Sequence, residues 1–368
     1  MTMTPRERVM TALHRGEPDQ IPWMENDIEE ALQYEIMGRT DFTPPELCEK
    51  LGLSAFGAHY PTGEVSDGQG MVTKETYKES YYNPKKVTFD FFPPWIAKMG
   101  TDPATGRTYI EKGLLTSEDS LTLFDEFLPD PQNPARYEKI AQWIKQYKGD
   151  YAVFARIRLG AASTLESMGL EEFSYAQMDN PDLIKKVMGR FAEWSAAVVD
   201  HLNEMDFDFF WANDDLAGNH GPFMSPKVFR ELMLPSMKIV ADRIKKPWIF
   251  HSDGNLFPIM EDLLSLGMTA VHPIQPCAMD MGKMKQEYGG RVGIVGNIDL
   301  DYTLPLGTVD EVDAEVQKRI MTAGPGGGYI VSSANSLTDY CKLENVLAMS
   351  KAIKKYGKYP LDGGETNV

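Results

Sequence analysis

The chain has 368 residues, of which 42% are hydrophobic and 25% charged, and this composition is typical of a folded globular protein. Its formal net charge of −17 disfavours nucleic acid and anionic membrane as partners, because both are polyanions that select surfaces rich in Lys and Arg. Residues 1–15 carry no apolar segment of signal-peptide length, and no segment approaches the roughly 18 consecutive apolar residues of a membrane span, so we expect a cytoplasmic protein.

The amino-terminal segment predicts one helix and two strands. Thr4 and Glu7 have the spacing of a capping box, with Pro5 at the first helical position, which predicts a helix from residue 5 to about residue 15. Residues 20–26 and residues 54–60 are short apolar runs that predict the first two strands.

Residues 70–115 interrupt this pattern with a long polar and aromatic stretch. Its β-prone pieces are separated by turn signals, such as residues 103–106, and they lie at residues 71–78, 86–92 and 107–111. A stretch of this length is too long for a simple loop between a strand and a helix. We therefore expect a β-rich insertion that covers one end of the fold as a lid.

From residue 150 onward, strand and helix patterns alternate regularly. Helices are expected to begin at Asn180-Pro181, at Ser225-Pro226 and near Thr308 or Asp310. The expected strands are residues 151–159, 207–214, 248–251, 270–273, 292–296 and 328–332.

Together with the two early strands, these six make eight, which predicts an α/β fold, a (β/α)8 TIM barrel. We expect a single domain over residues 1–368. The structural alternative is a doubly wound open sheet. The chain has neither a GxGxxG motif after its first strand nor a GxxxxGK[ST] phosphate loop, so the commonest reasons to prefer that alternative are missing.

In such a barrel, catalytic groups come from the carboxyl ends of different strands. Each expected strand delivers polar side chains there. In chain order, the candidates are Glu25 and Asn26; His59; Arg156 and Arg158; Trp211, Asn213, Asp214 and Asp215; His251 and Asp253; His272, Gln275 and Cys277; Asn297 and Asp299; and Ser333 and Asn335.

The pair His251 and Asp253 is the most informative of these. Side chains two positions apart on a strand point the same way, so the two can act as metal ligands or as an acid and base pair. Gly254 follows, which is typical of a place where the backbone must approach another group closely. Cys277 is a candidate further ligand, because it is a free thiol at a strand end.

Several candidates have an equally plain structural interpretation. Arg156 and Arg158 could bind a carboxylate or be halves of structural ion pairs. The run Asp214-Asp215 could be catalytic or cap a helix, and His272 could be chemical or a packed histidine. The remaining cysteines, Cys48 and Cys341, fall in expected helices and are interpreted as packing residues, without a disulfide framework.

Ordered motifs along nearly the whole chain resemble the uroporphyrinogen-decarboxylase-like superfamily, especially its branch of corrinoid-dependent methyltransferases. The matching segments are residues 4–9 and 16–22; 213–217, 221–222, 225–226 and 229–230; 251–255; 272–276; 296–299; and 328–336. The insertion resembles the family least. The resemblance implies a TIM barrel with its chemistry at the strand ends.

Two departures bear on the reaction. Where the decarboxylase carries an arginine-rich segment that holds porphyrinogen carboxylates, residues 22–27 here include carboxylates, which would repel such a substrate. Members that form methyl-coenzyme M bind zinc through a His-x-Cys pair and a further cysteine; here the matching positions are His251, Asp253 and Ser333. Zinc could still bind through His251, Asp253 and Cys277 or Glu25, because nitrogen and oxygen donors also suit it.

The resemblance therefore implies an O-demethylase methyltransferase, which transfers a methyl group from a methoxylated aromatic substrate to the cobalt of a separate corrinoid protein. Trp23, Phe210 or Trp211 would supply aromatic walls, and the insertion would be a docking surface or gate. Two alternative functions remain, a decarboxylase that acts on a smaller carboxylic acid and a non-catalytic binding barrel. The chain could also pair into a homodimer.

Overall fold

Seven parallel strands form the main sheet of the computed structural model, which describes residues 2–58, 91–103 and 108–361. Their order is β1-β4-β5-β8-β9-β10-β11, and every neighbouring pair is parallel. Their bounds are β1 Ala55–Gly57, β4 Ala152–Ile157, β5 Phe209–Asn213, β8 Trp248–His251, β9 Ala270–His272, β10 Gly293–Val295 and β11 Tyr329–Ile330. Each lies within a strand predicted from the sequence.

Residues 22–24 take the eighth strand position, between β11 and β1. Met24 N donates to Val331 O at 3.1 Å, and Val331 N donates to Pro22 O at 3.0 Å. On the other side, Ser54 N donates to Trp23 O at 2.7 Å. These bonds close the sheet, so the fold is the predicted (β/α)8 barrel, and an open doubly wound sheet with two free edges is excluded.

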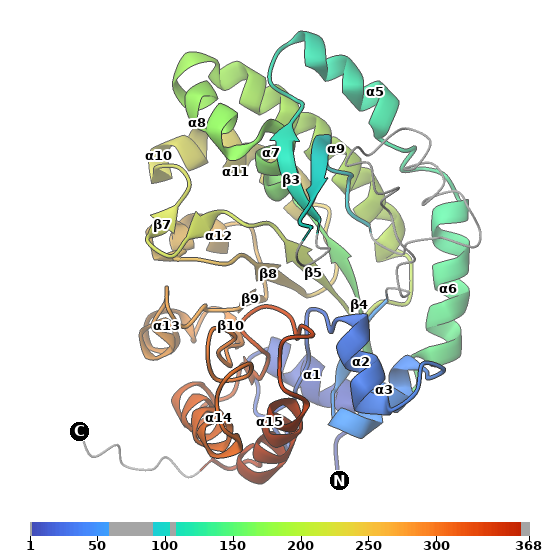
Figure 1. Ribbon diagram of the computed structural model, residues 1–368, viewed down its shortest axis with the longest axis vertical. Helices are drawn as coiled ribbons and strands as arrows, with labels where there is room; N and C mark the ends of the chain where they lie inside the picture. Colours follow the sequence, from blue (N-terminus) through green and yellow to red (C-terminus); the bar gives the residue numbers. More distant parts are fainter. Residues whose placement is uncertain (1, 59–90, 104–107, 362–368) are drawn as a thin grey trace.

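The helices surround the strands, as Figure 1 shows for β4, β5, β8 and β9. The predicted starts are confirmed for α1 Pro5–Leu13, α9 Pro181–Asn203, α10 Pro226–Val228 and α14 Val309–Ala323, which begin after Thr4, Asn180, Ser225 and Thr308. The other helices in the described part of the chain are α2 Glu30–Met37, α3 Pro44–Leu51, α5 Leu123–Phe127, α6 Ala135–Tyr147, α7 Ala161–Met168, α8 Leu170–Asp179, α11 Leu234–Ala241, α12 Met260–Leu264, α13 Met281–Tyr288 and α15 Leu343–Tyr356, with the short 3-10 helices η1 Asp119–Thr122 and η3 Phe257–Ile259 and the π-helical segment η2 Phe229–Met233. Among the helices described, none combines the length and apolar character needed to cross a bilayer.

Alternation along the strands separates two sets of buried side chains. Inward-facing residues such as Phe154, Phe209 and Trp211 pack together inside the barrel, and Val9 and Leu13 of α1 join them. The outward-facing residues pack against the surrounding helices in a second, larger cluster. Because α1 contributes to the interior cluster, it closes one end of the barrel and leaves chemistry to the other end.

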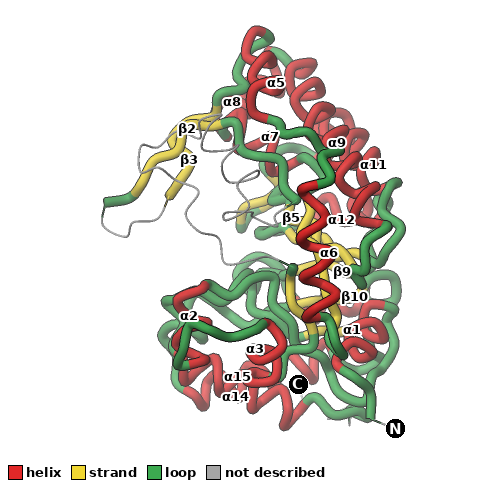
Figure 2. The backbone as a smooth tube through the Cα atoms, turned by 90° about the vertical axis from the view of Figure 1, so that its right-hand side faces the viewer, coloured by secondary structure: helices red, strands yellow, loops and turns green. Residues whose placement is uncertain are grey.

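The described part of the insertion is an antiparallel hairpin, β2 Ala97–Thr101 and β3 Thr108–Gly113. It is anchored on α7, because Leu115 N donates to Ser167 O at 2.8 Å and Ile96 N donates to Ser167 Oγ at 3.0 Å. Figure 2 shows the hairpin standing out to one side of the barrel. Of the β-prone piece at residues 107–111, the described residues 108–111 belong to strand β3. Residues 71–78 and most of 86–92 lie outside the described residues, and the lid function stays a prediction.

Candidate functional site

The carboxyl ends of β5, β8 and β9 bring three polar side chains side by side. Asn213 is paired in register with His251, and His251 with His272. Each lies two residues beyond an interior side chain of its strand, so strand alternation turns all three toward the barrel axis. His251 is 4% exposed and His272 is fully buried.

Asp215, His251 and Asp253 form a compact group of possible metal ligands. One ligand atom from each lies within 4.8 Å of the others. Asp215 Oδ1 is 3.8 Å from His251 Nε2 and accepts a hydrogen bond from Asp253 N at 2.9 Å. Asn335 Nδ2 donates to Asp253 Oδ2 at 2.7 Å, which fixes the orientation of that carboxylate. Burial raises the pKa of Asp253.

The donor set of this group fits a divalent cation such as zinc. One nitrogen and two carboxylate donors are ligand types that zinc accepts. Asp253 Oδ1 is buried and has no hydrogen-bond partner in the described part of the chain, so a cation would supply the interaction that this atom lacks.

Cys277 is not part of this group, although it was a candidate third ligand. It is exposed, and its Sγ accepts a hydrogen bond from Gln275 Nε2 at 3.2 Å. Gln275 in turn accepts from Gly254 N at 2.8 Å through Oε1. The third member of the group is Asp215, which contributes from the end of β5 rather than from the end of β9.

The two histidines form a buried pair. Their Nδ1 atoms are 2.7 Å apart, and His272 Nε2 lies 3.2 Å from Ser332 Oγ and 3.3 Å from the Ser333 carbonyl oxygen. The rings of Trp211 and His272 pack edge to face, with their centroids 4.9 Å apart. Burial lowers the pKa of His272 well below its usual value, so the ring is neutral.

Glu25 lies behind this pair and is 5% exposed. Its carboxylate accepts from Trp23 Nε1 at 2.6 Å, from Ser332 Oγ at 3.1 Å, and from both the backbone and the hydroxyl of Ser333. Burial raises the pKa of Glu25 to about 7, although these bonds oppose the shift. Ser333 therefore contacts Glu25 and is not among the ligand group.

Asp214 takes the helix-cap position that the sequence left open. Its oxygens accept from Leu159 N and, at 2.7 Å, from Ala162 N at the start of α7. It is fully buried, which raises its pKa to about 7. Both oxygens are engaged with backbone donors, so Asp214 positions α7 and the neighbouring Asp215.

Both candidate arginines are halves of ion pairs. Arg156 Nη1 lies 3.1 Å from Asp27 Oδ2, and Arg158 Nη1 lies 2.7 Å from Glu166 Oε2. Both guanidinium groups also lie over the ring of Phe92, at 5.7 and 4.8 Å from its centroid. Their charges are therefore balanced within the protein, which weakens the expectation that they anchor a substrate carboxylate.

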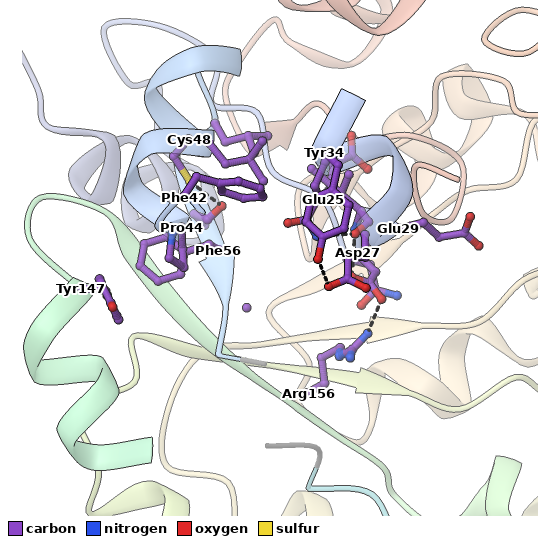
Figure 3. Close-up of a pocket in the computed structure, with 18 of the residues that line it drawn as sticks. Glu25, Asp27, Glu29, Tyr34, Phe42, Pro44, Cys48, Phe56, Tyr147 and Arg156 are labelled. Atoms are coloured by element: carbon purple, nitrogen blue, oxygen red, sulfur yellow. Dashed lines mark hydrogen bonds and ion pairs between the residues drawn. The ribbon is translucent and has the colours of Figure 1, made fainter. Parts of the chain in front are cut away.

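A cavity of about 620 Å³ opens beside the mouth, between the end of the first strand, β1 and helices α2, α3 and α6 (Figure 3). Glu25, Asn26, Asp27 and Arg156 line its side nearest the barrel axis. Its aromatic lining was not identified from the sequence and consists of Tyr34, Phe42, Phe56, Trp143 and Tyr147. The expected aromatic walls Trp23, Phe210 and Trp211 are instead at most 1% exposed and belong to the packed interior.

The remaining candidates are distributed around the mouth. Asn213 Nδ2 is 3.4 Å from Asn26 Oδ1, which links the large cavity to the strand that neighbours His251. Asn297 is fully buried and donates to the Ile274 carbonyl at 2.5 Å. His59 lies outside the described residues. A second hollow, of about 330 Å³, adjoins the ligand group at Asp253; Gln275, Asp299, Asn335 and Tyr340 are among its other lining residues.

Gly254 is a position where the close approach inferred from the sequence can be tested. Its φ is +83°, and an added Cβ would lie 2.5 Å from the backbone of Ala217. Gly267 has the same φ, no atom of the described residues lies within 4 Å of its added Cβ, and it is a matched control. Gly267→Ala should cost about 1–2 kcal/mol of unfolding free energy, and Gly254→Ala a further 1–3 kcal/mol or so, in urea unfolding. Equal losses would contradict the close approach.

The family model for uroporphyrinogen decarboxylase (URO-D) matches residues 133–356 of the chain. A methylcobamide:CoM methyltransferase MtaA from Methanosarcina barkeri is 22% identical over 189 residues, which cover 51% of this chain and 54% of that protein. A uroporphyrinogen decarboxylase from Pelodictyon phaeoclathratiforme is 26% identical over 213 residues, covering 53% and 58%. The chain thus spans little more than half the length of these curated relatives.

The solved structure of a methyltransferase from Methanosarcina mazei is similar over 96% of this chain and 99% of that one. The TM-score is 0.68 and the sequence identity is 18%. At this identity the likeness concerns the fold, and it agrees with the closed barrel described above.

Proposed function

The chain belongs to the uroporphyrinogen decarboxylase family, and from this premise we propose that it is a methyltransferase that moves a methyl group from a methoxylated aromatic substrate to the cobalt of a corrinoid protein. The observation that carries the proposal is the compact Asp215, His251 and Asp253 group at the barrel mouth. Asn213, which is paired in register with His251, lies 3.4 Å from Asn26, a residue that lines the aromatic cavity. The similarity to a methylcobamide:CoM methyltransferase supports methyl transfer with a corrinoid partner.

The chemical task is to activate a poor leaving group. Phenolate is a poor leaving group, so the ether oxygen must be polarised or protonated. The cobalt(I) of the corrinoid protein then attacks the methyl carbon in line, which forms the cobalt–carbon bond as the carbon–oxygen bond breaks. A divalent cation held by the group would act as a Lewis acid on that oxygen. His251 Nε2 and the carboxylates of Asp215 and Asp253 would hold it, and Asn335 would keep Asp253 in place.

The cavity would orient the substrate ring. Its volume of about 620 Å³ is within the usual range of roughly 300–1,000 Å³ for small-molecule sites. Phe42, Phe56 and Trp143 offer apolar faces to an aromatic ring. Because Asp27 balances Arg156 at the cavity edge, the lining favours a ring without several carboxylates, unlike a porphyrinogen.

The experiment combines metal analysis of the purified protein with a methyl-transfer assay. A panel of methoxylated aromatics is mixed with a reduced corrinoid protein, and loss of the cobalt(I) absorption is followed. Wild-type protein should consume cobalt(I) and release the phenol, whereas the His251→Ala, Asp253→Ala double variant should be inactive. Full activity of the double variant would remove the assignment. Release of CO2 from a carboxylic acid without any corrinoid would establish the decarboxylase alternative instead.

A further inference from the structure

A chain of four buried polar side chains crosses the barrel mouth and ends at the ligand group. It runs from Glu25 through Ser332 and His272 to His251, with successive contacts of 3.1, 3.2 and 2.7 Å. All four residues are at most 5% exposed. Water therefore has little access to these contacts, and the hydrogens must be distributed among the four groups themselves.

The surroundings of His272 fix which of its nitrogens carries a hydrogen. Nε2 faces the Ser333 carbonyl oxygen at 3.3 Å, and a carbonyl can only accept. Nε2 must therefore carry a hydrogen. His272 is fully buried and has no carboxylate contact among the described residues, which disfavours a second hydrogen, so His272 Nδ1 keeps its lone pair.

Glu25 reinforces this arrangement from the far end. In its ionised form, the Glu25 carboxylate also accepts from Trp23 Nε1 and from the backbone and hydroxyl of Ser333. The Ser332 hydroxyl hydrogen then points to Glu25 and leaves the oxygen lone pairs toward His272 Nε2. Two acceptors thus face the same N–H.

The consequence reaches His251. Only one hydrogen fits between two Nδ1 atoms 2.7 Å apart, and since His272 offers a lone pair, His251 must supply it. His251 Nε2 is then unprotonated, and it faces Asp215 and Asp253, which are themselves acceptors. Three acceptors that converge in this way form a site suited to a cation.

We infer that His272 is a positioning residue that holds His251 in the tautomer with its hydrogen on Nδ1, so that Nε2 is presented as a ligand for a divalent cation. This inference rests on the cation-binding part of the proposed function. Histidine ligands generally depend on a partner for their second nitrogen, and loss of that partner typically lowers metal affinity about 10–100-fold.

The test compares two substitutions that both remove the imidazole ring. His272→Asn keeps an acceptor oxygen near the former position of Nδ1, whereas His272→Leu has none. Zinc affinity is measured by competition with a chromophoric chelator. We expect a loss of about 10–100-fold in His272→Leu and substantial rescue in His272→Asn. Glu35→Gln, an exposed change on α2, is the control and should leave zinc affinity unchanged.

Nitrogen-15 NMR of labelled histidine provides a readout that does not depend on zinc or turnover. The metal-free wild type should show His251 with hydrogen on Nδ1, and its signals are identified by their absence in His251→Gln. A hydrogen on His251 Nε2 in the wild type would overturn the inference, whether or not the variants fold. Equal zinc affinity of His272→Leu and His272→Asn would also overturn it. Absence of methyl transfer with the expected tautomer and zinc binding would instead contradict the proposed function alone.

Discussion

Replacement of Asp253 by asparagine is expected to lower kcat/KM for methyl transfer by about 10²–10⁴-fold, the range typical of losing an acid or a polarising group at the reacting atom. The amide side chain would keep the shape of the carboxylate and could still contact Asn335, but it would remove one negative charge from the group with Asp215 and His251. Zinc affinity should fall in parallel. The measurements are steady-state cobalt(I) consumption and zinc competition on the same preparation.

A matched carboxylate change separates this effect from a general loss of charge. Glu261 lies on α12, in the same strand-and-helix unit as Asp253, and its exposed side chain pairs with Arg291. Glu261→Gln should leave both zinc affinity and kcat/KM close to the wild-type values. Wild-type activity in folded Asp253→Asn would show that the leaving group is activated elsewhere.

Replacement of Asp214 by alanine is expected to lower the free energy of unfolding by about 2–4 kcal/mol. The change leaves the backbone N–H groups of Leu159 and Ala162 without their acceptor, and a buried unsatisfied donor costs about 1–3 kcal/mol. Urea unfolding at pH 6 measures the loss. Activity per folded molecule should remain within an order of magnitude of wild type, whereas a loss comparable to that of Asp253→Asn would make Asp214 a catalytic group.

The pH dependence of stability gives a second test of Asp214. Burial disfavours the charged form of Asp214 and raises its pKa from an ordinary value of 3.8 to about 7 in the folded protein. The folded state therefore binds a proton on Asp214 more tightly than the unfolded state does. The stability gained from this protonation is fully present below about pH 4 and is lost as pH rises through 7. Between pH 5 and 7, wild type should lose up to about 1.4 kcal/mol per pH unit relative to Asp214→Asn, which cannot ionise. Parallel pH profiles would contradict the raised pKa.

Local sequence signals were sufficient for the barrel elements. The capping box at Thr4 and the N-cap residues Asn180, Ser225 and Thr308 mark helix starts because a side chain within a few residues satisfies the first backbone donors. Apolar runs such as residues 248–251 mark strands because the strands of a parallel barrel are buried on both faces. The first strand was harder to delimit, since residues 22–24 pair with neighbours without forming a regular ladder.

The sequence by itself determined the positions of the strands, their ends and the presence of His251 and Asp253 two positions apart at one of them, because these follow from local periodicity. Only the tertiary structure decided that Asp215, not Cys277, joins that pair, that Asp27 balances Arg156, and that α2, α3 and α6 supply the aromatic cavity lining. The physical reason is that each of these depends on contacts between segments far apart in the chain. Such contacts are set by strand register and helix packing, to which no local pattern is sensitive.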